Sequence, residues 1–288
     1  MADPVVRIAS GAWEARLLPA LGGAIVSLRL TDRDILRPSP ESPGRVLDTA
    51  CFPLVPYANR IAHGRFAFDG REITLPRNFG DHPHSLHGAS WQATWTVETV
   101  APDHVVLVHE HEADAAWPWR YRAEQAFRLN DDGLSVTLAL TNRDSSVMPA
   151  GLGFHPYFPA EPKTKLQMAT GGAWLSDAEQ LPVGLAPAEA VEDWTDGAPV
   201  IRSALVDHCF AGWDGAAVLT TGAHQTMLSA DGARFVHVHI PPHVDFVGIE
   251  PVSHMPDAIN RPEPPEDSGL TTLAPGATMR LTMRIAAS

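Results

Sequence analysis

Residues 134–141 read Leu-Ser-Val-Thr-Leu-Ala-Leu-Thr, with a large apolar side chain at every second position. Successive side chains of a β-strand point to opposite faces, so this period of two predicts a strand with one buried face. The segment from Met279 to Ile285 has the same period, and so does the segment from Ala93 to Glu98. Three such segments, spread along the chain, favour an all-β protein.

Short turn signals and many helix-breaking residues support this prediction. The turn signals are Asp69-Gly70, Asp131-Asp132-Gly133 and Asp231-Gly232. The 26 prolines and 22 glycines suit many short strands better than long helices. We interpret the Pro-, Ala- and Gly-rich stretch from Leu181 to Val200 as a long loop. Because similar strand patterns lie on both sides of it, we expect one large antiparallel β domain over residues 1–288.

The composition limits the possible partners and the compartment. Of the 288 residues, 44% are hydrophobic and 19% are charged, which is typical of a globular protein. A formal net charge of −13 would repel a phosphate backbone, so we expect no nucleic-acid partner. No apolar run is long enough to span a bilayer, and the N-terminus lacks the pattern of a signal peptide. Cys51 and Cys209 do not make a disulfide framework, and we expect a cytoplasmic protein without a membrane partner.

Two titratable residues stand in unusually apolar surroundings. His155 lies in Gly-Phe-His-Pro-Tyr-Phe, and Glu250 lies in Gly-Ile-Glu-Pro-Val at the end of an apolar run. A buried imidazole or carboxylate is costly unless it has a partner. Each alone is explained by a core hydrogen bond or a salt bridge. Together they favour a site, because an acid and a base can move protons between two oxygens.

Three further residues are candidates for a binding site. His87 is followed by a glycine, which permits close approach of a ligand, whereas we expect His82 and His84 to be solvated loop residues. Arg60 follows Asn59, and its guanidinium offers several donors to a ligand rich in hydroxyl groups. Asp207 can be interpreted either as a ligand-binding residue or as a surface carboxylate.

His237 and His239 raise the alternative of a metal site. On a strand they point to the same face, and His-x-His can supply two ligands to a metal ion. A polar sheet face that borders water or a groove explains the pattern equally well. We therefore predict no metal ligand, with the metal-dependent enzyme kept as an alternative that metal analysis would test.

Several segments, taken in their order along the chain, resemble the aldose 1-epimerase (galactose mutarotase) family. They are Asn59-Arg60-Ile61-Ala62-His63-Gly64-Arg65-Phe66, Leu75, Asn78, Leu86-His87-Gly88, Trp95-Thr96-Val97, Phe154-His155-Pro156-Tyr157-Phe158, Asp207-His208-Cys209-Phe210 and Gly248-Ile249-Glu250-Pro251. They keep the family's order and span most of the chain. The classical galactose mutarotases have Asn-His-Ser-Tyr-Phe where this chain has Phe-His-Pro-Tyr-Phe. This form resembles a bacterial branch with diverse substrates, so galactose itself is not implied.

The resemblance implies a large antiparallel β-supersandwich that binds a small-molecule sugar without a metal or organic cofactor. It implies that Glu250 is the catalytic base and His155 the catalytic acid. It implies that Arg60, His87 and Asp207 bind the substrate, with Asn59 as a weaker candidate. The oligomeric state expected is a monomer or a homodimer.

The expected reaction interconverts the α and β anomers of an aldose by ring opening and closure. A sugar ring placed between acid and base predicts that the polar atoms of His155 and Glu250 lie several ångströms apart. We expect Trp213 to offer its ring face to the sugar. Two alternatives remain. The first is a mutarotase of a phosphorylated or acidic hexose, for which Arg60, Arg77 and Lys163 are possible cationic groups. The second is a non-catalytic carbohydrate-binding protein.

Overall fold

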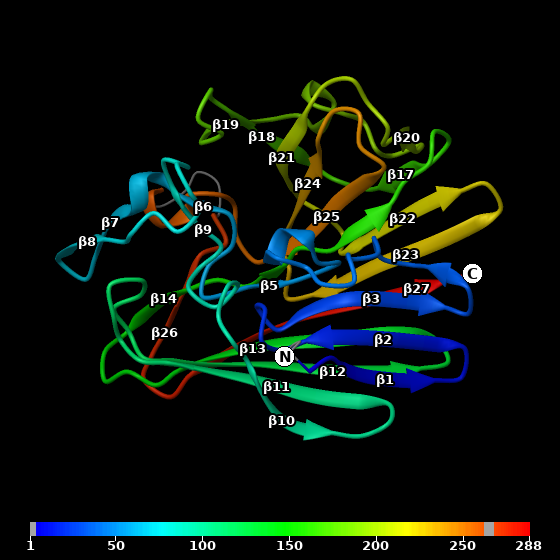
Figure 1. Ribbon diagram of the computed structural model, residues 1–288. Helices are drawn as coiled ribbons and strands as arrows, with labels where there is room; N and C mark the ends of the chain where they lie inside the picture. Colours follow the sequence, from blue (N-terminus) through cyan, green and yellow to red (C-terminus); the bar gives the residue numbers. More distant parts are fainter. Residues whose placement is uncertain (1–3, 262–267) are drawn as a thin grey trace.

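The structure is a computed structural model that describes residues 4–261 and 268–288 (Figure 1). Every strand pairing in these ranges is antiparallel, so the prediction of an antiparallel all-β protein is confirmed. Helix occurs in these ranges only as single 3-10 turns, none with the length or apolar character of a membrane-spanning helix. The turns are η1 (Val46–Asp48), η2 (Ala62–Gly64), η3 (Ala188–Ala190) and η4 (Ala258–Asn260).

The largest sheet contains two of the strands that the alternating sequence predicts. Leu138 and Leu281 stand opposite each other on neighbouring strands, and both are fully buried. In spatial order the nine strands are β10 (Thr96–Val100), β11 (His104–His111), β12 (Tyr121–Asn130), β13 (Gly133–Asn142), β27 (Thr278–Ala287), β23 (His224–Asp231), β22 (Ala216–Thr221), β17 (Lys165–Met168) and β20 (Ala198–Pro199).

The predicted strand that starts at Ala93 is wrong in its length and its burial. Strand β10 begins only at Thr96, and all five of its residues are exposed. It is an edge strand that pairs with β11 alone, and a bulge between Val97 and Thr99 shifts its register. Trp95 is buried just before it, where its indole N–H donates to the carbonyl of Ser90 at 3.1 Å. The apolar alternation here therefore reflects one buried tryptophan and not a buried strand face.

A second large sheet carries most of the chemically interesting residues. Its strands are β19 (Pro182–Ala186), β18 (Gly172–Ser176), β21 (Val206–Ala211), β24 (Phe235–Ile240), β25 (Phe246–Val252), β15 (Gly153–Phe154) and β5 (Pro53–Leu54), with β16 (Tyr157–Pro159) also pairing with β25. The stretch from Leu181 to Val200 is thus not one loop, since it contains β19, η3 and β20.

The remaining strands form smaller sheets around these two. They are β1 (Val6–Ser10), β2 (Trp13–Leu18), β3 (Ala24–Leu30) and β4 (Arg33–Asp34) in a four-stranded sheet, and the pairs β6 (Arg60–Ile61) with β9 (Ser85–Leu86), β7 (Arg65–Phe68) with β8 (Arg71–Thr74), and β14 (Met148–Ala150) with β26 (Thr271–Leu273). Strands β1–β3 run alongside β11–β13 in Figure 1, and buried side chains of both groups belong to one apolar core.

His254 is a buried histidine that anchors the segment leading to Asn59. Its Nε2 accepts the backbone N–H of Ala58 at 3.0 Å, and its Nδ1–H donates to the carbonyl of Met255 at 2.7 Å. Burial lowers the pKa of His254 to about 4, against an ordinary value of 6.5. The neutral ring therefore holds its two hydrogen bonds at neutral pH.

Because the pKa of His254 is lowered, its contribution to stability is complete above pH 6.5 and is lost as the pH falls toward about 4. We expect His254→Gln to be less stable than the wild type at pH 7 but to lose less stability between these two pH values. Urea denaturation at several pH values measures this. The same substitution at the exposed His224 is the control, and a His254→Gln pH slope equal to that of the wild type would contradict the prediction.

Candidate functional site

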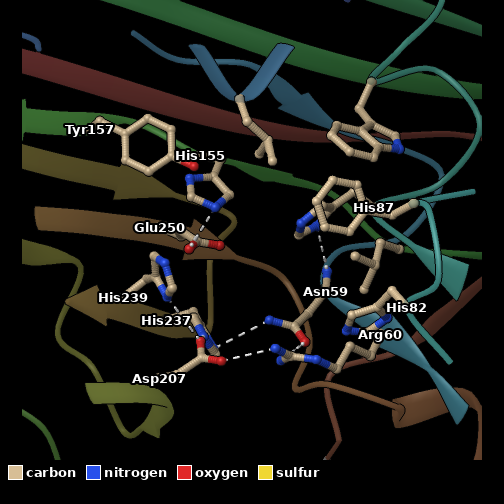
Figure 2. Close-up of a pocket in the computed structure, with 14 residues that line it drawn as sticks. Asn59, Arg60, His82, His87, His155, Tyr157, Asp207, His237, His239 and Glu250 are labelled. Carbon is tan, nitrogen blue, oxygen red and sulfur yellow. Dashed lines mark hydrogen bonds and ion pairs between the residues drawn. The ribbon is translucent and has the colours of Figure 1, made fainter. Parts of the chain in front are cut away.

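A pocket of about 190 Å³ opens on one face of the second large sheet (Figure 2). Besides that sheet, the turn η1 and the segments around Asn59 and His87 form its walls. The side chains that line it are Leu47, Asn59, Arg60, Phe79, His82, Leu86, His87, Trp91, His155, Tyr157, Asp207, His237, His239 and Glu250. All six residues proposed from the sequence as catalytic or substrate-binding are among them. Segments nearly 200 residues apart are thus brought together in one place.

The strand register explains why the polar residues of the sheet gather on one face. His237 on β24 stands opposite Glu250 on β25. Two residues further along β24, His239 stands between Asp207 on β21 and Gly248 on β25. Directly opposed residues of an antiparallel pair project to the same face. These pairings therefore place one imidazole beside each of the two carboxylates at the floor of the pocket.

Glu250 and His155 are in direct contact. His155 Nε2 lies 3.1 Å from Glu250 Oε1, and the two residues are 5% and 1% exposed. The predicted separation of several ångströms is therefore wrong. Gly153 pairs with Val252, and Tyr157 pairs with Gly248, so the residue midway between them on each strand faces its counterpart. His155 and Glu250 are those midway residues.

Burial governs the protonation of this pair. It lowers the pKa of His155 well below the ordinary value of 6.5, an effect that the neighbouring His87 reinforces. It raises the pKa of Glu250 well above 4.5, and the charge of Asp207 adds to that shift. Two groups in contact titrate as a pair, and the form that holds one proton between them is the favoured one. Glu250 Oε2 and His155 Nδ1 are buried, and neither has a hydrogen-bond partner among the residues that the structure describes.

Asp207 is the centre of a separate ionic network, visible in Figure 2. Arg60 Nη2 donates to its Oδ2 at 2.9 Å, and His237 Nε2 and His239 Nδ1 approach its Oδ1 at 2.7 and 3.3 Å. Burial alone would raise the pKa of Asp207, but the hydrogen bonds from the two histidines and the charge of Arg60 outweigh it. The pKa of Asp207 is therefore held well below its usual range, and the carboxylate is ionised.

Asn59 links this network to the opposite wall. Its side-chain carbonyl accepts Arg60 Nη1 at 2.9 Å, and its amide nitrogen lies 3.5 Å from His237 Nδ1. Its backbone N–H donates to His87 Nδ1 at 3.2 Å. The proton of His87 is therefore on Nε2, and because burial lowers the pKa of His87 to about 3, the ring is a neutral donor.

The backbone around His87 is shaped for this task. His87 has φ 58° and Gly88 has φ 83°, both in the left-handed region. A Cβ at position 88 would overlap the carbonyl oxygen of Val55. The glycine that follows His87 in the sequence thus permits a close backbone approach, and the second wall of the pocket can lie against the segment that carries Asn59.

Aromatic rings surround the acid–base pair. Phe52 stacks on His155 with ring centres 4.7 Å apart, and Tyr157 lies 4.5 Å away on another side. Arg37 packs over Tyr157 at 3.9 Å. Trp213, expected to face the sugar, does not line the pocket, and its indole N–H donates to the carbonyl of Ala216 at 2.8 Å. Tyr157 was visible in the sequence only as a neighbour of His155.

His84 is not the solvated residue expected from the sequence, whereas His82 keeps part of its surface exposed. His82 lines the pocket, and His84 is fully buried. His84 Nδ1 accepts the backbone N–H of His63 at 3.1 Å, and its Nε2 lies 3.1 Å from the carbonyl of Glu179. These two hydrogen bonds, formed with distant segments, remove His84 from solvent.

The same region contains the one group of possible metal ligands in the described ranges, namely His63, His84 and Glu179. Both ring nitrogens of His84 are already used in the hydrogen bonds above. His237 and His239, the pair singled out from the sequence, instead direct nitrogens to Asp207. The structure thus gives the His-x-His pattern a role within a hydrogen-bond network.

Comparisons with known proteins agree with the fold described above. The sequence profile of the family described as aldose 1-epimerase matches residues 5–286. The Escherichia coli K12 protein YphB, itself uncharacterized, is 36% identical over 92% of this chain and 93% of its own length. A crystal structure from the same strain, provisionally assigned as an aldose 1-epimerase, superposes with a TM-score of 0.91 at 31% identity, covering 99% of each chain.

A galactose mutarotase-like protein from Clostridium acetobutylicum has the same fold, with a TM-score of 0.88 at 19% identity over 99% of this chain and 95% of that one. The family profile covers nearly the whole chain, and the relative above 30% identity covers more than two thirds of it. This protein, with its galactose mutarotase-like β fold, therefore belongs to the aldose 1-epimerase family.

Proposed function

We propose that the protein is a mutarotase that interconverts the α and β anomers of an uncharged aldose by general acid–base catalysis. The observation that carries this proposal is the contact between Glu250 and His155 in a pocket rich in hydrogen-bonding groups. Glu250 is the base, and His155 is the acid. The substrate-binding residues are Arg60, His87, Asp207 and, through its network, Asn59.

The close contact suits this reaction. The hydroxyl oxygen that loses a proton and the ring oxygen that gains one are both bonded to the anomeric carbon. An acid and a base that serve these two oxygens can therefore stand side by side, and the sugar lies over both of them. Glu250 Oε2 is buried and has no hydrogen-bond partner of its own, so we assign it as the oxygen that accepts the proton of the anomeric hydroxyl.

Ring opening moves two protons and breaks one bond. Glu250 takes the proton of the anomeric hydroxyl, His155 gives a proton to the ring oxygen, and the bond from that oxygen to the anomeric carbon breaks as the aldehyde forms. Rotation about the C1–C2 bond presents the other face of the aldehyde, and closure reverses both transfers. Concerted transfer avoids a bare alkoxide, and each positioned group contributes roughly 10²–10⁴-fold.

The pair contains the same number of protons throughout. Before ring opening His155 is protonated and Glu250 is ionised. Afterwards the proton of His155 is on the former ring oxygen, and Glu250 holds the proton taken from the anomeric hydroxyl. Burial favours the neutral form of each group, so between turnovers the shared proton rests on Glu250. Transfer across the 3.1 Å contact then prepares the acid and the base without exchange with water.

The charges in the pocket favour an uncharged sugar over a phosphorylated or acidic hexose. Among the described residues that line it, Arg60 is the sole arginine, lysine being absent, and Arg60 is already paired with Asp207 at 2.9 Å. Arg77 and Lys163 do not line the pocket. A phosphate or carboxylate would therefore meet no uncompensated cationic side chain there.

The first test is polarimetry of freshly dissolved anomers of common hexoses, pentoses and their 6-phosphates. We expect the protein to accelerate the mutarotation of at least one free aldose more than that of any phosphorylated sugar. Rates equal to buffer for the whole panel would refute the proposal. Preference for a phosphorylated sugar would refute only the part that concerns charge.

Glu250→Gln keeps the size of the side chain and one acceptor oxygen, but it removes the base. We expect kcat to fall by roughly 10²-fold or more, while the sugar Kd stays within about a factor of ten, since the Asp207 network is untouched. Glu72→Gln at an exposed position is the control. An equal loss of binding and turnover would assign Glu250 to binding, and a retained kcat would remove it from the mechanism.

The pH dependence of kcat/KM reports the protonation of the Glu250–His155 pair in the enzyme without bound sugar. Activity requires one proton on the pair, so it falls when a second proton binds at low pH and when the shared proton leaves at high pH. The pKa of His155 is lowered, so we expect the second proton to bind only well below pH 6.5, and the pKa of Glu250 is raised, so we expect the shared proton to leave only well above pH 4.5. Loss of activity on the acid side centred at or above pH 6.5 would contradict the prediction.

A further inference from the structure

Arg37 lies next to the acid–base pair without lining the pocket. The carbon of its guanidinium group is 3.9 Å from the centre of the Tyr157 ring and 4.6 Å from that of Phe246. Tyr157 lines the pocket, and its ring centre is 4.5 Å from that of His155. One aromatic ring therefore contacts both the cation and the proposed catalytic acid.

Hydrogen bonds fix Arg37 in this position. Its Nη2 donates to the carbonyls of Leu47 and Thr49, each at 2.7 Å, and its backbone N–H donates to the carbonyl of Tyr157 at 2.8 Å. Leu47 belongs to η1 and lines the pocket. Arg37 thus ties η1 to Tyr157, so that the ring beside His155 has one defined place.

The charge of Arg37 is not compensated as that of Arg60 is. Among the described residues no carboxylate forms an ion pair with Arg37, and Asp48 and Asp245 act on it only at longer range. Asp48 is itself paired with Arg45 at 2.9 Å. A partly buried charge without an ion pair is weakly screened, so its field extends to the groups around it.

Several other titratable groups face His155. They are Glu250 on β25, His237 and His239 on β24, His87 on the opposite wall, Tyr157 and the thiol of Cys51. Burial raises the pKa of Tyr157 and of Cys51, so both are neutral, and it lowers the pKa of His87 and of His237. Arg37, by contrast, stays charged at any pH at which the enzyme is assayed.

Building on the mutarotase activity proposed above, we infer that Arg37 is a positioning residue for the acid–base pair: it fixes Tyr157 against His155, and its positive charge makes protonated His155 a stronger acid. The ring oxygen of a sugar is a weak base, so its protonation is easier from an imidazolium that a nearby cation destabilises. Burial is the main cause of the lowered pKa of His155, and the charge of Arg37 acts in the same direction.

Three substitutions separate the charge of Arg37 from its packing. Arg37→Gln and Arg37→Met remove the charge, whereas Arg37→Lys keeps it but loses the planar group that donates to two carbonyls. Removing a cation favours protonation of the pair, so we expect both limbs of the pH profile of kcat/KM to move up by roughly 0.5 pH units or more in the neutral variants. In Arg37→Lys we expect both limbs to stay in place, even if kcat falls.

Arg202→Gln is the matched control. Arg202 also packs over an aromatic ring, at 5.2 Å from the centre of Trp194, and donates to the carbonyl of Pro199 at 2.7 Å, but it does not line the pocket. Its pH profile should equal that of the wild type. Unmoved limbs in both neutral variants would overturn the inference, and so would an equal shift in Arg37→Lys, which would assign the effect to packing.

A second measurement tests the inference without a substrate. In protein labelled with 15N-histidine, the signals of His155 are those missing from the spectrum of His155→Gln, and their change with pH reports the protonation of the pair. We expect this change to move to higher pH in Arg37→Gln but not in Arg37→Lys. A wild type inactive on every sugar would refute the proposed function, whereas unmoved His155 signals would overturn the inference about Arg37.

Discussion

Strand β25 forms hydrogen bonds along both of its edges, and the site depends on this double pairing. On one edge it pairs with the continuous strand β24, and on the other with β15 and β16, which are separated by His155 and Pro156. The first pairing places His237 beside Glu250. The second places His155 opposite Glu250, and a shift of one residue in either register would turn Glu250 to the other face of the sheet.

The polar floor that results is stable because its charges are compensated separately. Asp207 is ionised and is balanced by Arg60, with two histidines as further donors. Glu250 is also buried, and within residues 4–261 and 268–288 the only cation in direct contact with it would be a protonated His155. The same low-dielectric environment therefore maintains one carboxylate as a fixed anion and leaves the other free to exchange a proton.

The sequence predicts well the strands and turns that depend on residues close together in the chain. The alternating residues of β13 and β27 define buried strands, and the Asp-Gly signals mark real turns between strands. The unusual surroundings of His155 and Glu250, with the family resemblance, identify six residues that the fold gathers in one pocket. These patterns are visible because periodicity and turn chemistry are encoded within a few neighbouring residues. The burial of His84, the exposure of β10 and the close contact of His155 with Glu250 depend on pairing between distant segments, which no local pattern records.

The residues that line the pocket come from segments far apart in the sequence, and this affects how the site forms during folding. Asn59 directly precedes β6 and Glu250 lies on β25, so no short fragment of the chain contains both walls of the pocket. Topologies dominated by contacts between distant residues fold slowly, because chain entropy is lost before those contacts form. The proposed activity therefore requires the paired sheets, so the return of activity during refolding would report when the last of these long-range pairings forms.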